Sequence, residues 1–565
     1  MTRKKTTNMT WNRTISRRQA LGSILAVPAA SVLARGAETP VKLARPTPQQ
    51  VTWQDRELEM FLSYGPQTWQ GQEYDNLSTR PSDINPAKLD TDQWTETARA
   101  MGAGLLLFVA KHTGGFCWWQ TNTTSYGVKE SPWRGGKGDV MKDLAASCRK
   151  AGIKLGVYLS PEDLTLGAAV SGRCKTPEAQ ARYNAIYRQQ LTELLSHYGE
   201  IAEVWFDGSN VVKVGDILKQ FAPKAMVFQG EFATIRWSGN EDGLAPDPGW
   251  NSVREATARS GTATAKDSTP DGDTWLPIEC DAMIRSGWFW RQANTHTLKT
   301  LDDLMAMYYR SVGHGAVLLL NNTPDTTGLI PAADARRSAE FGEEIRRRFS
   351  HSVAETHGEG NLVELKLAQP ARIDLVIAME DIREGERVRE YRVEGMVGNQ
   401  WQELSRGTAI GHKKIDPFKA VEVSAVRFRA VRAAARPLLR RLAVYDVGRG
   451  RPELAVESER YAFRVIREWK AFSGTKQAWL IDLTPYCDEA RQYELEFVIT
   501  GGGLHVHSLA LVQRGVESPD FVKPGIRRNT YLINITGLSA AMQLRAVVSS
   551  GPELSYGQVT LRKLL

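Results

Sequence analysis

Short hydrophobic runs alternate with helical patterns between residues 50 and 350. The runs that suit strands fall at 104–111, 153–160, 202–208, 225–230, 274–281 and 315–322. Near-continuous runs of this kind are typical of parallel strands buried on both faces, and residues 139–152 repeat apolar positions at helical spacing. The alternation predicts an α/β fold, a (β/α)8 (TIM-like) barrel over residues 38–350. A doubly wound open sheet is the alternative, although its glycine-rich phosphate turn is missing.

The pattern changes after residue 352. Residues 362–369 and 371–378 alternate hydrophobic and polar positions with a period of two, which is typical of antiparallel strands with one buried face. Gly448 to Pro452 interrupts this pattern. We therefore expect two C-terminal antiparallel β-sandwich domains, one at 351–450 and a second, sandwich-like domain at 451–565.

Polar side chains gather where the predicted barrel strands end. The stretch AEVWFDGSN, residues 202–210, ends a hydrophobic run on Asp207, and the next turn-forming residue is Gly208. Other strand ends carry Lys111, His112, Tyr158, Ser160, Glu231, Glu279, Asp281, Asn321 and Asn322, and tryptophans lie nearby at 118, 119, 205, 237, 250, 288 and 290. Barrel active sites lie at the carboxyl ends of the strands. Aromatic rings that stack on sugars, together with carboxylates and imidazoles that bind hydroxyls, predict a carbohydrate site.

Each of these residues also has a purely structural interpretation. Asp207 could cap the following helix, Glu241 could be a solvated acid in a turn, and His112 could be a hydrogen-bonded core histidine. The catalytic interpretation gains weight because a glycosidase needs two carboxyl groups with separate roles.

The charge of the chain is concentrated at its N-terminus. The chain of 565 residues has a formal charge of +8, but residues 1–37 contain seven Lys/Arg and no acid, which leaves 65 basic against 64 acidic residues. This balance gives no support for a nucleic-acid partner or an anionic membrane surface. The five cysteines are scattered without a CxxC pair, so a zinc site or a redox motif has no support. We expect neither a metal nor a cofactor.

The basic N-terminus has the features of an export signal. Arg17 and Arg18 precede an apolar stretch that ends near Ala37, which predicts a twin-arginine signal peptide over residues 1–37. A disordered basic tail is the alternative. The apolar stretch is too short for a comfortable membrane span, so we expect no membrane insertion after signal removal and a periplasmic or secreted protein.

Several motifs resemble one enzyme family. AKHTGGFCWW (110–119) is similar to a motif of glycoside hydrolase family 29, the retaining α-L-fucosidases. Further stretches match in the same order at 136–163, 190–208, 235–243, 277–290 and 308–330, so that the resemblance covers about residues 53–335. The later motifs look like the branch that is selective for α-1,3/1,4-linked fucose in branched glycans. The resemblance implies a glycan substrate and hydrolysis through a covalent glycosyl-enzyme.

The resemblance also implies residue roles. Asp207 matches the nucleophile of the family, and Glu241 matches its acid/base residue. Only 34 residues separate the two, because the strand–helix segment between them looks shortened, so Glu279 or Glu231 could take the place of Glu241. With the strand-end residues and tryptophans, the predicted substrate-binding set is Glu73, Tyr74, His112, Trp118, Tyr158, Trp205, Arg236, Trp237, Glu279 and Trp288.

The chain departs from the family pattern at the sugar site. Ser63 and Thr113 stand where the family has histidines, and Gly114 stands where it has an acid. The predicted function is an exported retaining exo-glycosidase, an α-L-fucosidase acting on fucosylated glycans. One alternative is a barrel retuned to another α-linked sugar by Ser63 and Thr113. The other is a carbohydrate-binding protein with little catalysis.

Overall fold

The structure is a computed structural model that describes residues 43–448, 464–487, 490, 492–524, 529–551 and 554–563. The predicted signal peptide at 1–37 and the predicted domain boundary near residue 450 lie outside the described residues.

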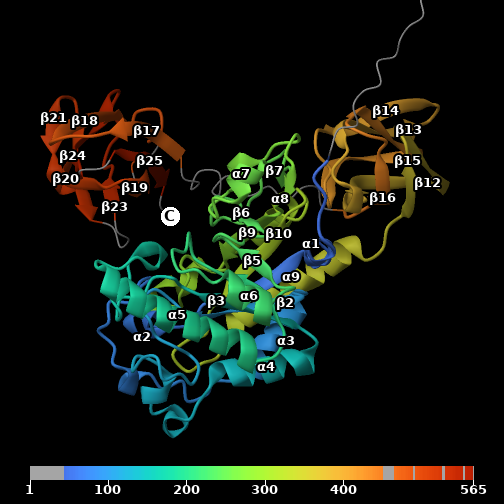
Figure 1. The fold of residues 1–565 in the computed structure, drawn as a ribbon. Coiled ribbons are helices and arrows are strands. Elements are labelled where there is room, and N and C mark those ends of the chain that lie inside the picture. The colour runs from blue at the N-terminus through green and yellow to red at the C-terminus, as the bar shows by residue number, and fades with distance from the viewer. Residues whose placement is uncertain are drawn as a thin grey trace, which may run out of the picture. The chain divides into compact units, whose positions relative to one another are not determined.

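An eight-stranded parallel sheet forms the centre of the first domain (Figure 1). Its order is β5-β4-β3-β2-β1-β10-β9-β6, and an isolated parallel bridge between Phe228 and Ile235 links the regions of the two outermost strands, so the barrel is nearly closed. The strands are β1 (Leu58–Leu62), β2 (Leu105–Lys111), β3 (Lys154–Leu159), β4 (Ile201–Trp205), β5 (Met226–Phe228), β6 (Arg236–Trp237), β9 (Ile278–Met283) and β10 (Val317–Asn322). The predicted barrel is confirmed.

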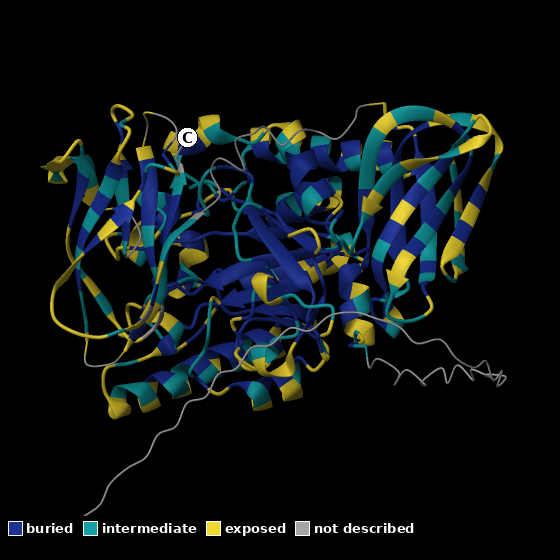
Figure 2. Cartoon of the chain, turned by 90° about the horizontal axis from the view of Figure 1, so that it is seen from above, coloured by how far each residue is buried: buried dark blue, intermediate teal, exposed yellow. Residues whose placement is uncertain are grey.

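Helices cover the outside of this sheet. They are α3 (Thr91–Met101), α4 (Val140–Ala151), α5 (Pro177–His197), α6 (Gly215–Phe221), α8 (Leu301–Arg310) and α9 (Ala332–Phe349). The ends of α4 follow from the sequence, because the Asp139 carboxylate accepts the Lys142 N–H at 2.8 Å and Gly152 ends the helix in the left-handed conformation. In Figure 2 the central strands are buried along their length, whereas exposed positions lie on the helices.

Shorter elements complete the domain. They are α1 (Pro48–Gln54), α2 (Pro66–Gln70) and α7 (Glu255–Ala258), and the two-stranded sheet of β7 (Ser252–Val253) and β8 (Thr274–Trp275).

One strand–helix unit of the barrel is reduced to a turn. Residues 229–235 connect β5 to β6, and no helix forms within this described stretch. The N–H groups of Thr234 and Ile235 instead both donate to the carbonyl of Val227, at 2.8 and 3.2 Å. This shortened connection explains why Asp207 and Glu241 are close in sequence.

The second domain is a six-stranded antiparallel sheet in the order β11-β16-β12-β15-β13-β14. Its strands are β11 (Ala354–Glu359), β12 (Leu362–Glu380), β13 (Val388–Val397), β14 (Gln400–Gly407), β15 (Lys414–Ala433) and β16 (Leu438–Tyr445). The alternating residues Val363, Leu365 and Ile373 are buried in one core with Phe428 and Leu442, as the period of two predicts.

The third domain has a five-stranded sheet, β17-β25-β19-β23-β22, and a four-stranded sheet, β18-β24-β20-β21. Its strands are β17 (Arg464–Phe472), β18 (Gln477–Asp482), β19 (Gln492–Gly501), β20 (Leu504–Gln513), β21 (Val516–Ser518), β22 (Val522–Pro524), β23 (Thr530–Asn534), β24 (Met542–Ser550) and β25 (Ser555–Lys563). Both sheets contribute side chains to one core, which fits a sandwich. Among the described residues of the whole chain, no helix is long and apolar enough to cross a membrane.

Candidate active site

A cavity of about 120 Å³ lies at the carboxyl ends of the barrel strands. Aromatic side chains and carboxyl groups dominate its lining, which consists of Phe61, Ser63, Tyr74, Val109, His112, Tyr158, Trp205, Asp207, Phe228, Gln229, Trp237, Glu241, Asp281 and Trp288. The structure therefore brings both predicted catalytic residues to one cavity, together with six predicted substrate-binding residues: Tyr74, His112, Tyr158, Trp205, Trp237 and Trp288.

Asp207 reaches the cavity because β4 ends two residues before it. The Phe206 N–H still pairs with the Phe228 carbonyl at 3.1 Å, and Gly208 then turns the chain with a φ of 87° that favours glycine. The Gly208 N–H donates to the side-chain oxygen of Gln229, which fixes the turn. The hydrophobic run thus places a carboxylate at the rim of the barrel, where it opens to the cavity.

Asp207 is exposed to solvent through the cavity, and the protein atoms around its carboxyl group remove part of the hydration that this group would have in open water. This loss of hydration raises its pKa, while a hydrogen bond from the Tyr158 hydroxyl to Oδ2, at 3.0 Å, opposes the rise. The negative charge of Glu241 raises the pKa further. Burial and the Asp207 charge hold the pKa of Tyr158 well above its usual range, so the phenol stays a proton donor.

Glu241 lies in a turn that follows β6. The Asn240 side-chain oxygen accepts the N–H groups of Asp242 at 3.1 Å and Leu244 at 3.3 Å, which is a typical side-chain-stabilised turn. Of the two neighbouring acids, Glu241 lines the cavity and Asp242 does not, although burial raises the pKa of Asp242 to about 6. Two carboxyl groups that face one small cavity can divide the roles of a glycosidase.

Stacked rings form the floor of the cavity. The Trp205 ring stacks on Phe228 with centroids 3.9 Å apart and on Tyr158 at 5.4 Å. The centroid of the Phe61 ring lies 5.3 Å from that of Trp205 and 5.5 Å from that of Trp288. The mutual packing of these rings presents a rigid apolar surface of the kind that stacks on a sugar ring.

His112 enters the cavity as a neutral imidazole, because burial lowers its pKa to about 4. Its Nδ1 lies 2.9 Å from the Gln67 amide nitrogen and 3.2 Å from the Thr113 hydroxyl. An amide N–H can only donate, so Nδ1 accepts and the proton of the ring is on Nε2. Thr113 therefore supports His112, and Ser63 lines the cavity directly.

Four predicted substrate-binding residues lie outside the cavity lining: Glu73, Trp118, Arg236 and Glu279. Trp118 is buried, stacks on Tyr64 at 4.6 Å and donates its indole N–H to the Tyr64 carbonyl at 2.7 Å. Arg236 is buried and donates to the Trp250 carbonyl at 2.5 Å. Glu73 accepts the backbone N–H of Trp288 at 2.6 Å, so it holds a residue of the cavity lining without lining the cavity itself.

The two substitutes for Glu241 also lie elsewhere. Glu231 is exposed and pairs with Lys213 at 2.5 Å. Glu279 is fully buried and accepts the Trp205 indole N–H at 2.9 Å from below the cavity floor. Neither carboxyl group reaches the cavity, so the structure corrects the expectation that one of them could replace Glu241 there.

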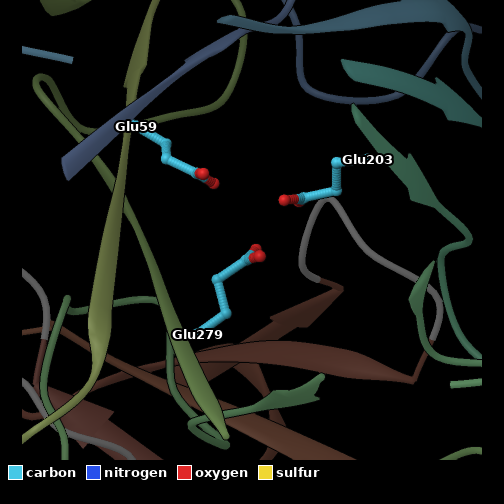
Figure 3. Close-up of side chains that lie close together, drawn as sticks. All are labelled: Glu59, Glu203 and Glu279. Carbon is cyan, nitrogen blue, oxygen red and sulfur yellow. The ribbon is translucent and has the colours of Figure 1, made fainter. Parts of the chain in front are cut away.

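Glu279 belongs to a buried cluster of carboxylates with Glu59 and Glu203, defined here as the lower cluster. The three side chains point toward one another from β9, β1 and β4 (Figure 3), and their oxygens lie within 4.8 Å of one another. Among the described residues this is the one group of three acids, histidines or cysteines close enough to share a cation. Arg56 and the indoles of Trp53 and Trp205 each donate to one of its carboxylates.

The cavity includes residues that the sequence interpretation did not assign to the site. Asp281 is the one that the sequence could have identified most easily, because it is an acid at the end of a predicted strand. Gln229 follows β5 in the shortened connection, where the sequence pattern gives no such indication. Phe61, Val109 and Phe228 face the cavity from hydrophobic runs and cannot be told from core residues by pattern alone.

Comparisons with known proteins identify the family of the chain. The family model "Alpha-L-fucosidase" matches residues 44–347. "Alpha-L-fucosidase 1" of Arabidopsis thaliana is 32% identical over 455 residues, which cover 71% of this chain and 88% of that protein.

Solved structures give the same result. A glycoside hydrolase 29 family member from an unknown rumen bacterium aligns with a TM-score of 0.67 and 26% identity over 93% of this chain and all of that one. A Ruminococcus gnavus GH29 fucosidase in complex with fucose aligns with a TM-score of 0.64 and 27% identity over 73% of this chain and 96% of that one. The chain belongs to the alpha-L-fucosidase family, glycoside hydrolase family 29, and is a glycoside hydrolase.

Proposed function

We propose that the protein is an exported, retaining exo-α-L-fucosidase that releases terminal fucose from fucosylated glycans. The observation that carries this proposal is that Asp207 and Glu241 line one small aromatic cavity at the rim of the barrel. The relative from Arabidopsis thaliana is named an alpha-L-fucosidase, and the Ruminococcus gnavus relative was solved with fucose, which supports fucose as the sugar.

In the first step an Asp207 oxygen bonds to the anomeric carbon while the bond from that carbon to the aglycone oxygen breaks. Glu241 donates its proton to the departing oxygen and becomes a carboxylate. In the second step Glu241 takes a proton from water, the water oxygen bonds to the anomeric carbon and Asp207 leaves. Two inversions give net retention of configuration.

The cavity supplies what these steps need besides the two carboxyl groups. The Tyr158 hydroxyl donates to the Asp207 carboxylate and holds one oxygen in place. Neutral His112 presents an Nε2–H donor for a sugar hydroxyl, and the Trp205 floor offers an apolar surface to the ring. A cavity of about 120 Å³ suits a single terminal sugar, which favours exo-action.

The stereochemistry of hydrolysis tests the mechanism. Proton NMR of p-nitrophenyl α-L-fucoside hydrolysis should show α-L-fucose as the first anomer formed, before mutarotation. Azide then identifies the residues. In Asp207→Ala, azide should attack the substrate directly and give β-L-fucosyl azide. In Glu241→Ala, azide should attack the glycosyl-enzyme and give α-L-fucosyl azide. β-L-Fucose as the first product of the wild-type enzyme would exclude retention.

Export is proposed from the N-terminal sequence. Arg17 and Arg18 before an apolar stretch support the twin-arginine route to the periplasm or beyond. Replacing both arginines with lysine should retain the precursor inside the cell, which fractionation with an activity assay measures. Unchanged export of this variant would contradict the proposed route.

A further inference from the structure

Strand β9 holds the segment that carries Glu241. The Ser238 N–H donates to the Glu279 carbonyl at 2.8 Å, and the Gly243 N–H donates to the Asp281 carbonyl at 3.2 Å. An isolated antiparallel bridge also pairs Asp242 with Ala282. Residues 238–243 are therefore fastened to β9 on both sides of Glu241, and Asp281 lies on β9 beside this segment.

The side chain of Asp281 lines the cavity and contacts Trp237, another residue of the lining. It is only 3% exposed, and its Oδ1 accepts the indole N–H of Trp237 at 2.6 Å. Trp237 also lines the cavity but lies on β6, a strand of two residues whose connection to β5 contains no helix. Pairing with β9 fixes the backbone of Trp237, and the hydrogen bond to Asp281 then fixes the direction of its ring.

We propose that Asp281 is a positioning residue of the glycosidase reaction, which holds the Trp237 ring against the sugar site. The inference rests on the proposed function, because it takes the cavity lined by Asp207 and Glu241 as the fucose site.

The surroundings of Asp281 explain why it carries no charge. Burial and the negative charge of Glu241 hold its pKa well above the usual range, and the Trp237 hydrogen bond only partly opposes this. The titratable groups that face Asp281 across the cavity or along β9 are Glu241, Asp207, Tyr158, His112, Tyr74, Glu279 and Cys280. In the described lining of this cavity there is no lysine or arginine. A third carboxylate here would have no counter-charge, whereas a neutral acid still accepts the indole N–H.

A double-mutant cycle on KM tests the inference, with p-nitrophenyl α-L-fucoside as the substrate. Asp281→Ala removes the acceptor, and Trp237→Phe keeps a ring but removes the donor. Each single variant should raise KM about tenfold, with kcat changed by less than about threefold. Because both changes break the same hydrogen bond, the KM of the double variant should exceed the KM of either single variant by no more than about twofold. A KM increase in the double variant that equals the product of the two single-variant increases would overturn the inference.

The conservative variant and a matched control separate positioning from general structural damage. Asp281→Asn keeps a side-chain oxygen for the indole and should bring KM back to within about threefold of wild type, with its pH–rate profile unmoved. A displaced basic limb in Asp281→Asn would show that Asp281 is ionised and would overturn the inference. Glu203→Ala removes another buried acid that accepts an indole N–H, from Trp53 at 2.9 Å, and should lower stability without raising KM.

The outcome does not depend on every variant folding. If Asp281→Ala is unfolded at the assay temperature, Trp237→Phe and Asp281→Asn carry the same prediction. Wild-type turnover of the aryl fucoside is measured first, so a failure of the proposed function appears as no turnover, and a failure of the inference appears as an active enzyme with unmoved KM in Trp237→Phe.

Discussion

The barrel contains two sets of three carboxyl groups that share strands but differ in their access to water. Asp207, Glu241 and Asp281 line the cavity at the rim, and the lower cluster of Glu59, Glu203 and Glu279 is sealed within the barrel with no exposed surface. β4 and the residues just after it contribute one acid to each set, Glu203 below and Asp207 above. β9 does the same with Glu279 and Asp281.

The comparison teaches that depth along a strand decides what an acid can do. In the lower cluster one oxygen of each carboxyl group accepts a hydrogen bond from Arg56 or an indole, and Glu203 also shares hydrogen bonds with Glu59 and Glu279. Burial raises the pKa of all three, most strongly for Glu203 and Glu279, so these two acids keep protons and accept indole N–H groups, while Arg56 pairs with the charged Glu59. At the rim, a cavity can admit a substrate, so carboxyl groups there can react with it.

The largest expected effect compares two acids four residues apart. Asp207→Asn should lower kcat by about 10⁴-fold or more, because an amide cannot form the glycosyl-enzyme. Glu203→Gln, which keeps an acceptor for the Trp53 indole, should leave kcat within about threefold of wild type. Steady-state rates on p-nitrophenyl α-L-fucoside measure both. Equal losses would mean that the two sets are not functionally separate.

Sequence reasoning predicted the barrel and two of the three acids at its rim, Asp207 and Glu241. The hydrophobic runs at 104–111 and 153–160 contain β2 and β3, because strands buried on both faces carry an unbroken apolar signal. The strand predicted at 274–281 has the wrong bounds. Thr274 and Trp275 form the separate short strand β8, and β9 lies at Ile278–Met283. Both Asp207 and Glu241 reach the cavity as the motifs implied.

The sequence could not separate acids by depth. Glu279 and Asp281 are two residues apart on one strand, and nothing in the pattern says that the first lies under the floor and the second lies in the cavity. Arg236 and Trp118 likewise look like ligand-binding residues by type, but they bind the carbonyl groups of Trp250 and Tyr64. Side-chain direction at a barrel rim depends on where each strand ends, and strand ends are the least certain feature of a sequence pattern.

The next effect sharpens the role of Glu241. Glu241→Gln should lower kcat/KM by about 10²–10⁴-fold on a fucosylated oligosaccharide, whose departing sugar needs a proton. The loss should shrink on 2,4-dinitrophenyl α-L-fucoside, whose phenolate leaves unaided. Glu279→Gln should change neither rate by more than about threefold. A loss in Glu241→Gln that is the same for both substrates would remove Glu241 from the acid role.

A smaller effect concerns stability and pH in the lower cluster. Burial and the charge of Glu59 raise the pKa of Glu279 to about 8, above its ordinary value of 4.5. The folded state therefore binds this proton more tightly than the unfolded chain. The resulting stability is fully present below pH 4.5 and is lost as pH rises through about 8, with a slope of at most about 1.4 kcal/mol per pH unit for one proton.

Glu279→Gln removes this titration and should flatten the fall in stability across that range. Urea unfolding followed by circular dichroism at pH 5, 6, 7 and 8 measures the slopes. Glu231→Gln is the matched control, because Glu231 is exposed, and it should keep the wild-type slope. A wild-type stability that rises from pH 5 to pH 8, with Glu279→Gln following it in parallel, would contradict a protonated Glu279.

The smallest expected effect probes Trp205, whose ring faces the cavity while its indole N–H donates to Glu279 below. Trp205→Phe should cost about 1–3 kcal/mol of unfolding free energy, because a buried acceptor loses its donor, and should raise KM a few-fold, because the floor loses area. Trp53→Phe removes the corresponding donor to Glu203 at 2.9 Å away from the cavity, so it should cost similar stability and leave KM unchanged. If both variants raised KM equally, the lower cluster would act on the sugar site as a whole. If only Trp205→Phe does so, the two sets meet at this one ring, and the barrel separates binding above it from support below.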